Sequence, residues 1–238
     1  MGLAKEKNLC YTLWLLSTVR EEKMTTVRAY TIGEEIGSSI SHGLGAFLGI
    51  AALCVLVVLS AIYANAWAVV GSAIFGASWI LMYSASTFYH AIPFDRAKKI
   101  LKKFDHISIY YLIAGTYTPL ILCQLRTPAG WAVFGVVWGA ALIGTILKLW
   151  IGGSGAKAWS VGLYLAMGWA VLFVLKDIVA RLNAVALTFL VLGGIFYTLG
   201  ILFYLWKSKA YTHFVWHCFV LTGTIMHFFA VLFGCIFI

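Results

Sequence analysis

The chain has 238 residues, of which 63% are hydrophobic and only 11% are charged, and its formal net charge is +9. Soluble domains carry about 25% charged residues, so this composition excludes an ordinary soluble fold and predicts a membrane protein. The basic residues stand in short gaps between apolar runs, which is typical of membrane topology, and we expect no nucleic-acid partner.

The first 29 residues are predicted to be a tail outside the membrane domain. Residues 9–16 are apolar but too few to span a bilayer, and residues 17–22 contain no small-residue cleavage site of a signal peptide. Two interpretations stay open: a dispensable tail, or an upstream start codon with Met24 as the true start. Residues 31–36 are predicted to form a short amphipathic lead-in whose acids favour the start of a helix.

Residues 30–238 are predicted to form one all-α membrane domain, a seven-transmembrane helix bundle. Each apolar segment has about the 20 residues that a helix needs to cross the hydrocarbon. The segments do not alternate between polar and apolar residues, which excludes a membrane barrel. The predicted spans are residues 38–62, 66–90, 105–125, 129–150, 158–178, 184–206 and 212–237.

The distribution of lysine and arginine predicts the orientation of the bundle. Fourteen of the 17 basic residues fall in the N-terminal tail or in the loops after the second, fourth and sixth segments. Cytoplasmic loops carry the excess of basic residues, so we expect a cytoplasmic N-terminus and a C-terminus outside. This orientation is the reverse of that of a G-protein-coupled receptor.

Polar residues gather at the predicted cytoplasmic ends of three segments. The second segment ends with Ser86 and His90, the third begins with Asp105, and the seventh begins with His213 and His217. Residues four apart share one face of a helix, so each pair presents both side chains to the same side. The topology therefore brings three imidazoles, a carboxylate and a hydroxyl to one depth on one side of the membrane.

Three histidines with an open fourth position suit a catalytic zinc ion. Asp105 would then accept a proton from the zinc-bound water or hold that water, and Ser86 would orient it. In the alternative interpretation the histidines cap helices and hydrogen-bond across the bundle, while Asp105 caps a helix N-terminus. Both interpretations stay open at this point.

The remaining histidines are weaker candidates. His106 follows Asp105 and points about 100° away from it, so we expect a packing or interfacial role. His42 lies at a similar depth and is either a partner of a metal ligand or a helix-to-helix hydrogen-bonding residue. His227 shares a face with His213, but fourteen residues, or about 21 Å along the axis, exclude it from the same site.

A proline interrupts the third segment next to two polar residues. Pro119 removes a backbone hydrogen bond and bends a helix, and Thr116 and Tyr117 lie just before it. The stretch is interpreted either as a packed kink or as the polar wall of an internal cavity.

Five stretches carry a resemblance to a known family. At these stretches the chain resembles the hemolysin III family, the bacterial branch of the progestin and adipoQ receptor superfamily, and its members named for membrane homeostasis. The resemblance covers about residues 30–232. The stretches are EIGSSISHG (35–43), STFYH (86–90), FDHISIYYLIAGTYTP (104–119), GGIFYTLGILFY (193–204) and HFVWHCFVLTGTIMHFFAV (213–231).

The resemblance implies a bacterial inner-membrane protein that holds Zn²⁺ near the cytoplasmic face. The similar adiponectin receptors bind zinc through three histidines, which correspond to His90, His213 and His217, with an aspartate, here Asp105, acting through water. Ser86 matches the motif serine of the superfamily, which includes the alkaline ceramidases. The implied function is a zinc-dependent hydrolase of lipid amide or ester bonds with membrane lipids as partners. A non-enzymatic membrane-state sensor with structural zinc and a pore-forming hemolysin are the alternatives.

Overall fold

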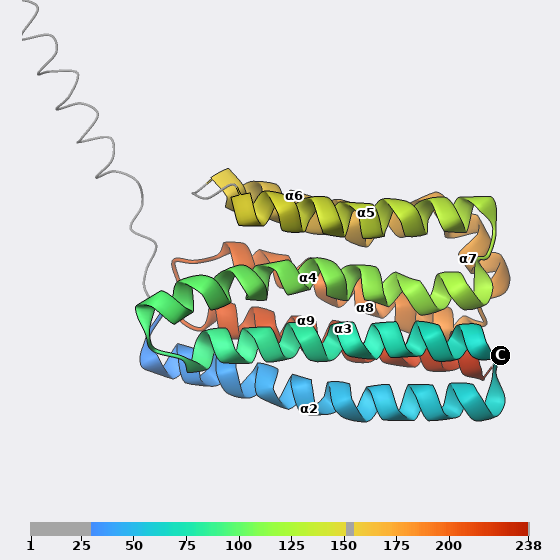
Figure 1. Cartoon of the computed structure of the whole chain (residues 1–238), viewed down its shortest axis with the longest axis horizontal. Helices are drawn as coiled ribbons and strands as arrows, with labels where there is room; N and C mark the ends of the chain where they lie inside the picture. Colours follow the sequence, from blue (N-terminus) through green and yellow to red (C-terminus); the bar gives the residue numbers. More distant parts are fainter. Residues whose placement is uncertain (1–29, 151–154, 238) are drawn as a thin grey trace, which may run out of the picture.

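The computed structural model describes residues 30–150 and 155–237, and its elements are helices joined by short connections (Figure 1). The predicted tail, residues 1–29, lies outside the described residues. Seven helices of the described ranges are long and apolar enough to cross a membrane, which confirms the predicted seven-helix, all-α membrane architecture. In chain order the elements are α2 (Ile32–Tyr63), α3 (Ala66–Ala91), α4 (Asp95–Gln124), α5 (Pro128–Trp150), α6 (Gly155–Gly168), the 3₁₀ helix η1 (Trp169–Val174), α7 (Leu175–Arg181), α8 (Ala184–Leu205), α9 (Thr212–Val231) and the π-helical turn η2 (Leu232–Ile236).

The first spanning helix begins earlier than its hydropathy predicts. The Thr31 hydroxyl accepts a hydrogen bond from the Glu34 backbone N–H (3.3 Å), and Glu34 Oε2 accepts one from the Thr31 N–H (2.9 Å). This capping box satisfies two backbone donors at the helix start. The predicted lead-in, residues 31–36, is therefore continuous with the spanning helix instead of forming a separate segment.

The third spanning helix also begins earlier than predicted, at Asp95 rather than at residue 105. Its first turns carry the basic residues Arg96, Lys98 and Lys99, which hydropathy assigns to a loop. Asp105 consequently lies ten residues inside α4 and does not cap its N-terminus.

The fifth span is a helix that changes its hydrogen-bonding pattern midway, from α6 through η1 to α7. The Tyr117 hydroxyl lies within hydrogen-bonding distance of the carbonyl oxygens of Met167 (2.9 Å) and Gly168 (2.7 Å). It also accepts a hydrogen bond from the Val171 N–H (3.0 Å). A side chain of α4 thus stabilises backbone groups that the change of helix type exposes.

Glycines allow α2 and α3 to pack closely. A Cβ atom at Gly45 would overlap the ring of Tyr83, and one at Gly49 would lie 2.9 Å from Trp79 Cδ1. The Trp79 indole N–H donates a hydrogen bond to the Gly45 carbonyl oxygen (2.9 Å). Small residues at helix contacts are a common way of joining membrane helices, and here they fix α3 against α2.

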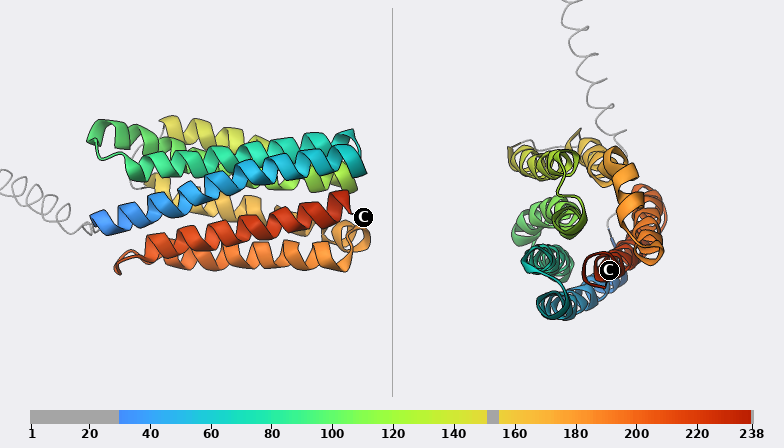
Figure 2. Two further views of the ribbon diagram at one scale, coloured as in Figure 1. Left: turned by 90° about the horizontal axis from the view of Figure 1, so that it is seen from below. Right: turned by 90° about the vertical axis from the view of Figure 1, so that its right-hand side faces the viewer.

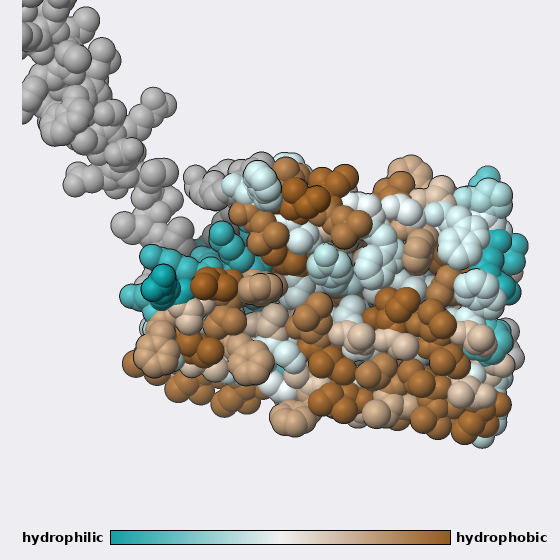
Figure 3. Space-filling view, in the orientation of Figure 1, coloured by the Kyte–Doolittle hydropathy of each residue, from teal (hydrophilic) through white to brown (hydrophobic). Residues whose placement is uncertain are grey.

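Seen along its axis, the bundle is a ring of helices in chain order, and α9 returns to lie beside α2 (Figure 2). Apolar side chains cover the face formed by α2 and α3, and hydrophilic residues gather at the two ends (Figure 3). Exposed apolar side chains such as Phe47, Val136 and Phe173 are expected of a surface that faces lipid. The start of α2 and the end of the chain lie at opposite ends of the bundle (Figure 1).

Candidate metal centre

Three histidine side chains converge at the end of the bundle where α2, α4 and α9 begin and α3 ends, here termed the histidine end. His90 belongs to the last turn of α3, and His213 and His217 belong to the first two turns of α9. The distance from His213 Nε2 is 3.3 Å to His90 Nε2 and 3.2 Å to His217 Nε2. All the potential ligand atoms lie within 4.8 Å of one another.

The spacing of these nitrogens fits a zinc ion. Zinc binds imidazole nitrogens at about 2.0–2.1 Å, so two ligands of a tetrahedral ion stand about 3.3 Å apart. The Nε2–Nε2 distances from His213 to His90 and to His217 match this tetrahedral edge. Among the described residues, 30–150 and 155–237, these three histidines form the group of three or more His, Cys, Asp or Glu side chains that lie close enough together to hold a metal ion.

Hydrogen bonds to the other ring nitrogen orient the imidazoles of His90 and His217. His90 Nδ1 lies 2.6 Å from Glu35 Oε2, and His217 Nδ1 lies 3.3 Å from the Ser38 carbonyl oxygen. With Nδ1 protonated, each ring donates to its oxygen acceptor and keeps Nε2 available as a ligand. Carboxylates and carbonyls fix metal-binding histidines in this way in many proteins.

Aromatic contacts hold the rings from the side. The Tyr30 ring stacks on His213 at 4.8 Å between centroids, and the His42 ring stacks on His217 at 3.6 Å. Trp216 packs against both His213 (4.9 Å) and His217 (5.1 Å). The helix-to-helix hydrogen bond that was one expectation for His42 is not formed within the described residues, because neither ring nitrogen has a partner there.

A buried carboxylate anchors the residue that directly precedes α9. Glu34 is 2% exposed, and its Oε1 accepts a hydrogen bond from the Tyr211 backbone N–H (2.7 Å). Tyr211 directly precedes α9 and adopts a left-handed backbone conformation (φ 62°), which costs of order 1–3 kcal/mol in a residue other than glycine. Glu34 therefore fixes the point from which His213 and His217 extend.

The two predicted catalytic side chains are buried, Ser86 on the same helix as His90 and Asp105 on α4. Ser86 lies one turn before His90 on α3, and its hydroxyl has no hydrogen-bond partner within the described residues. Asp105, on α4, is 4% exposed. The carboxylate of Asp105 is not part of the group of atoms that lie within 4.8 Å of one another.

Two histidines lie apart from the trio. His106 Nδ1 hydrogen-bonds to the carbonyl oxygen of Lys102 (2.6 Å) in its own helix. The buried His227 ring packs against Tyr197 (5.2 Å between centroids) and against the backbone of Gly193. Neither belongs to the group of potential metal ligands.

An apolar cavity of about 290 Å³ lies inside the ring of helices. Its lining comes mainly from α4, the fifth span, α8 and α9, and includes Thr116, Tyr117 and His227. The Thr116 hydroxyl donates to the Leu112 carbonyl oxygen of its own helix (2.7 Å), so the polar groups of this wall are largely bonded to backbone. Trp216 lines the cavity and also contacts two of the three histidines, so the cavity adjoins the candidate metal centre.

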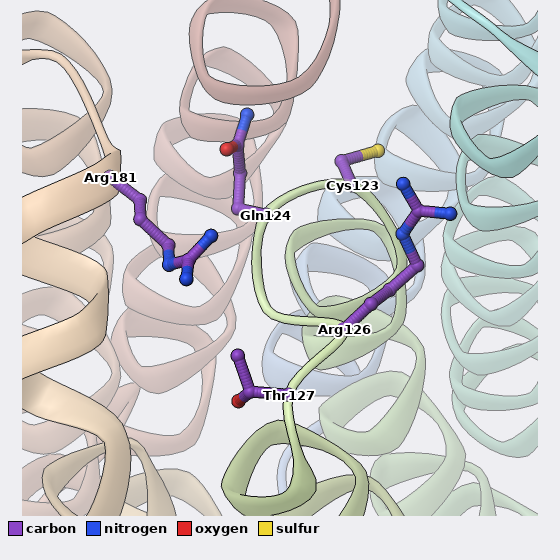
Figure 4. A pocket seen from close by; sticks show the side chains of 5 residues that line it. All are labelled: Cys123, Gln124, Arg126, Thr127 and Arg181. Carbon is purple, nitrogen blue, oxygen red and sulfur yellow. The ribbon is translucent and has the colours of Figure 1, made fainter.

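A second hollow, of about 410 Å³, lies near the opposite end of the bundle and is lined by Cys123, Gln124, Arg126, Thr127 and Arg181 (Figure 4). Arg126 extends toward Cys123 and away from Arg181. Its guanidinium group stacks on the Trp67 ring at 5.2 Å. The two arginines therefore do not converge on a common point.

Sequence reasoning missed the contact between Glu35 and His90. It assigned Glu35 only a favourable interaction with the helix dipole. The missed signal is periodicity: Glu35, Ser38 and His42 are three and four residues apart, so they share one face of α2. That face also presents the buried Gly45 and Gly49 to α3, and this packing could have indicated which helix Glu35 meets.

Comparison with known proteins agrees with the resemblance in the sequence. The family model described as haemolysin-III related matches residues 30–228. The chain belongs to this family. It is 41% identical over 210 residues to a hemolysin-3 homolog of Bacillus subtilis (strain 168), covering 87% of this chain and 97% of the relative.

A hemolysin-3 of Bacillus cereus is 40% identical over 212 residues, covering 89% of this chain and 96% of the relative. The human monocyte to macrophage differentiation factor is 25% identical over 194 residues, covering 78% of this chain and 79% of the relative. This distant similarity supports the wider superfamily. Together with the seven apolar helices, membership of the haemolysin III-related family identifies a multi-pass membrane protein.

Proposed function

We propose that this haemolysin III-related protein is a zinc-dependent hydrolase that cleaves an amide or ester bond of a membrane lipid. The observation that carries the proposal is the trio of imidazole nitrogens within 4.8 Å, beside an apolar cavity. Trp216 contacts both features, so an acyl chain in the cavity would bring its carbonyl group toward the histidines.

When bound, zinc supplies a water with a pKa of about 7 and polarises a substrate carbonyl. His90, His213 and His217 would hold the ion, and Asp105 would accept the proton that the attacking water loses. As the C–N or C–O bond of the substrate breaks, Asp105 would return this proton to the leaving amine or alcohol. The Ser86 hydroxyl donates a hydrogen bond to the oxygen that gains negative charge. The buried surroundings strengthen both interactions, because water does not screen them.

The alternative is a membrane-state sensor or regulator in which zinc is structural. One observation favours it: the ligands come from α3 and α9, and Glu35 of α2 bonds to one of them. A metal there would fasten three helices at one end of the bundle. In this case, loss of zinc would lower stability without changing any lipid species.

Metal analysis followed by lipid analysis separates the two functions. The purified wild-type protein is expected to hold stoichiometric zinc, and His217→Ala is expected to lose it. His227→Ala is the matched control, since this histidine is on the same helix but outside the trio. Cells that express wild-type protein should show a lipid species consumed and its cleavage product formed, and cells that express His217→Ala should not.

Three results would decide against the hydrolase. If wild-type protein holds no zinc after purification in zinc-containing buffer, both the hydrolase and the sensor with structural zinc are contradicted. Full lipid turnover in the His217→Ala variant would exclude a zinc-dependent reaction. An unchanged lipid profile, together with a lower unfolding temperature of His217→Ala, would favour the structural role.

We place the protein in the bacterial inner membrane with the histidine end toward the cytoplasm. The support is the excess of basic residues at that end, including Arg96, Lys98 and Lys99 in the first turns of α4. A lipid substrate would then enter from the inner leaflet.

A further inference from the structure

Glu35 contacts two other helices at the histidine end. Its Oε2 lies 2.6 Å from His90 Nδ1 of α3, and its Oε1 lies 2.8 Å from Lys98 Nζ of α4. The side chain of His90 is fully buried and that of Glu35 is 19% exposed. The carboxylate is therefore held on both oxygens, one by a candidate metal ligand and one by a basic residue.

This arrangement determines which nitrogen of His90 faces the other histidines. An imidazole that donates its Nδ1–H to a carboxylate keeps the lone pair on Nε2. His90 Nε2 is the atom that lies 3.3 Å from His213 Nε2. Without the acceptor, the ring could rotate about its side-chain bonds, which would move Nε2 away from the other two histidines. It could also take the tautomer with its proton on Nε2, which would remove the lone pair that binds a metal.

The position of Glu35 is itself well defined. It lies in the first turn of α2, directly after Glu34, which belongs to the capping box and also bonds to the Tyr211 N–H. The start of α2 therefore contacts three neighbours: Glu34 bonds to Tyr211 before α9, and Glu35 bonds to His90 of α3 and to Lys98 of α4. A carboxylate on a helix turn that is capped and held by these contacts can act as a rigid acceptor.

We propose that Glu35 is a positioning residue of the metal centre, which holds His90 in the tautomer and orientation that bind zinc. The proposal rests on the proposed zinc binding at His90, His213 and His217. Glu35 acts through His90 and not on the substrate. Changing Glu35 is therefore expected to alter the zinc affinity of the purified protein, which can be measured without a substrate.

Zinc affinity of the purified protein, measured by competition with a chromophoric chelator, tests the proposal through four variants. Glu35→Ala removes the acceptor and is expected to weaken zinc binding by about 10–100-fold. Glu35→Asp keeps the charge but is one methylene shorter, so it should weaken binding as well. Glu35→Gln keeps an acceptor oxygen at the same reach and should stay within about threefold of wild type.

The fourth variant, Lys98→Ala, breaks the ion pair but leaves the bond to His90, and its affinity should also stay within about threefold of wild type. Asp95→Asn is the matched control for loss of a negative charge in the same region, because Asp95 is exposed on the first turn of α4. This control should bind zinc like wild type.

The outcomes separate this inference from the proposed function. If wild-type protein binds no zinc, the proposed function fails and the inference fails with it. If wild-type protein binds zinc and Glu35→Ala binds it equally well, only the inference is overturned. A purely electrostatic or structural role would weaken Glu35→Gln and Lys98→Ala as much as Glu35→Ala, and that pattern would overturn it too. Glu35→Asp keeps the test valid if Glu35→Ala does not fold.

Discussion

Several polar atoms are buried around the three histidines without a hydrogen-bond partner in the described part of the chain. They are the Ser86 hydroxyl oxygen and both ring nitrogens of His42. An unpartnered buried polar group costs roughly 1–3 kcal/mol of stability. A polar group of a bound substrate would supply a partner, so these atoms support a ligand-binding role for this end of the bundle.

Asp105 is the residue on which the proposed chemistry depends most. Asp105→Asn keeps the size of the side chain but removes its ability to accept a proton, so lipid turnover is expected to fall by about 10²–10⁴-fold. Zinc content should not change, because Asp105 is not one of the three ligands. Turnover is measured by the release of lipid product by purified protein in detergent.

The matched control for Asp105 is Asp95→Asn, a change on the same helix at an exposed position. This variant should retain full turnover. Undiminished turnover in Asp105→Asn would assign the proton acceptor to another group. Loss of zinc from Asp105→Asn would make Asp105 a ligand instead of a proton acceptor.

At the scale of the helices, the contact between α2 and α3 aligns Glu35 with His90. Gly45→Ala would place a methyl group into the ring of Tyr83, which is fully buried. Overpacking of this kind costs about 1–3 kcal/mol, so the unfolding temperature in detergent should fall. Zinc affinity should fall with it, because α2 would move away from α3.

The matched control is Gly139→Ala on α5, where an added Cβ has nothing within 4 Å. There the change replaces glycine in a helix interior, which favours the helix by about 1 kcal/mol. Its unfolding temperature should stay the same or rise. An equal loss of stability in both variants would contradict the prediction, because only Gly45→Ala brings a methyl group into the Tyr83 ring.

Hydropathy predicts that the seven spans exist but not where each helix begins. It places the starts of α2 and α4 six and ten residues too late, because polar residues extend both helices beyond the apolar core. A capping box, not hydrophobicity, begins α2. The 3₁₀ stretch of the fifth span was also not predicted, since it depends on contacts with Tyr117 of another helix.

The site is predictable to the extent that topology determines it. The order of the spans and the spacing of the histidines are sufficient to bring His90, His213 and His217 together, since they lie at helix ends on one side of the bundle. The role of Glu35 was not predictable in this way, because it depends on the rotation of α2 about its axis. That rotation is determined by tertiary packing of glycines against the rings of α3, which one sequence does not reveal.

For the whole molecule, the two ends of the bundle have different chemistry. The histidine end carries the candidate metal centre and the basic first turns of α4, and the opposite end carries Arg126 and Arg181. The apolar cavity adjoins the first end through Trp216. This asymmetry means that the membrane orientation decides which leaflet can supply a substrate.

Reporter fusions test the orientation. An alkaline phosphatase fused after Ile238 should be active, because this enzyme folds only outside the cytoplasm, and a green fluorescent protein at the same point should be dark. Fusions after Lys209, before the last span, should give the reverse result. The positive-inside bias predicts this pattern, since 14 of 17 basic residues belong to the predicted cytoplasmic side. The opposite pattern would turn the histidine end outward, and substrates would then have to come from the outer leaflet.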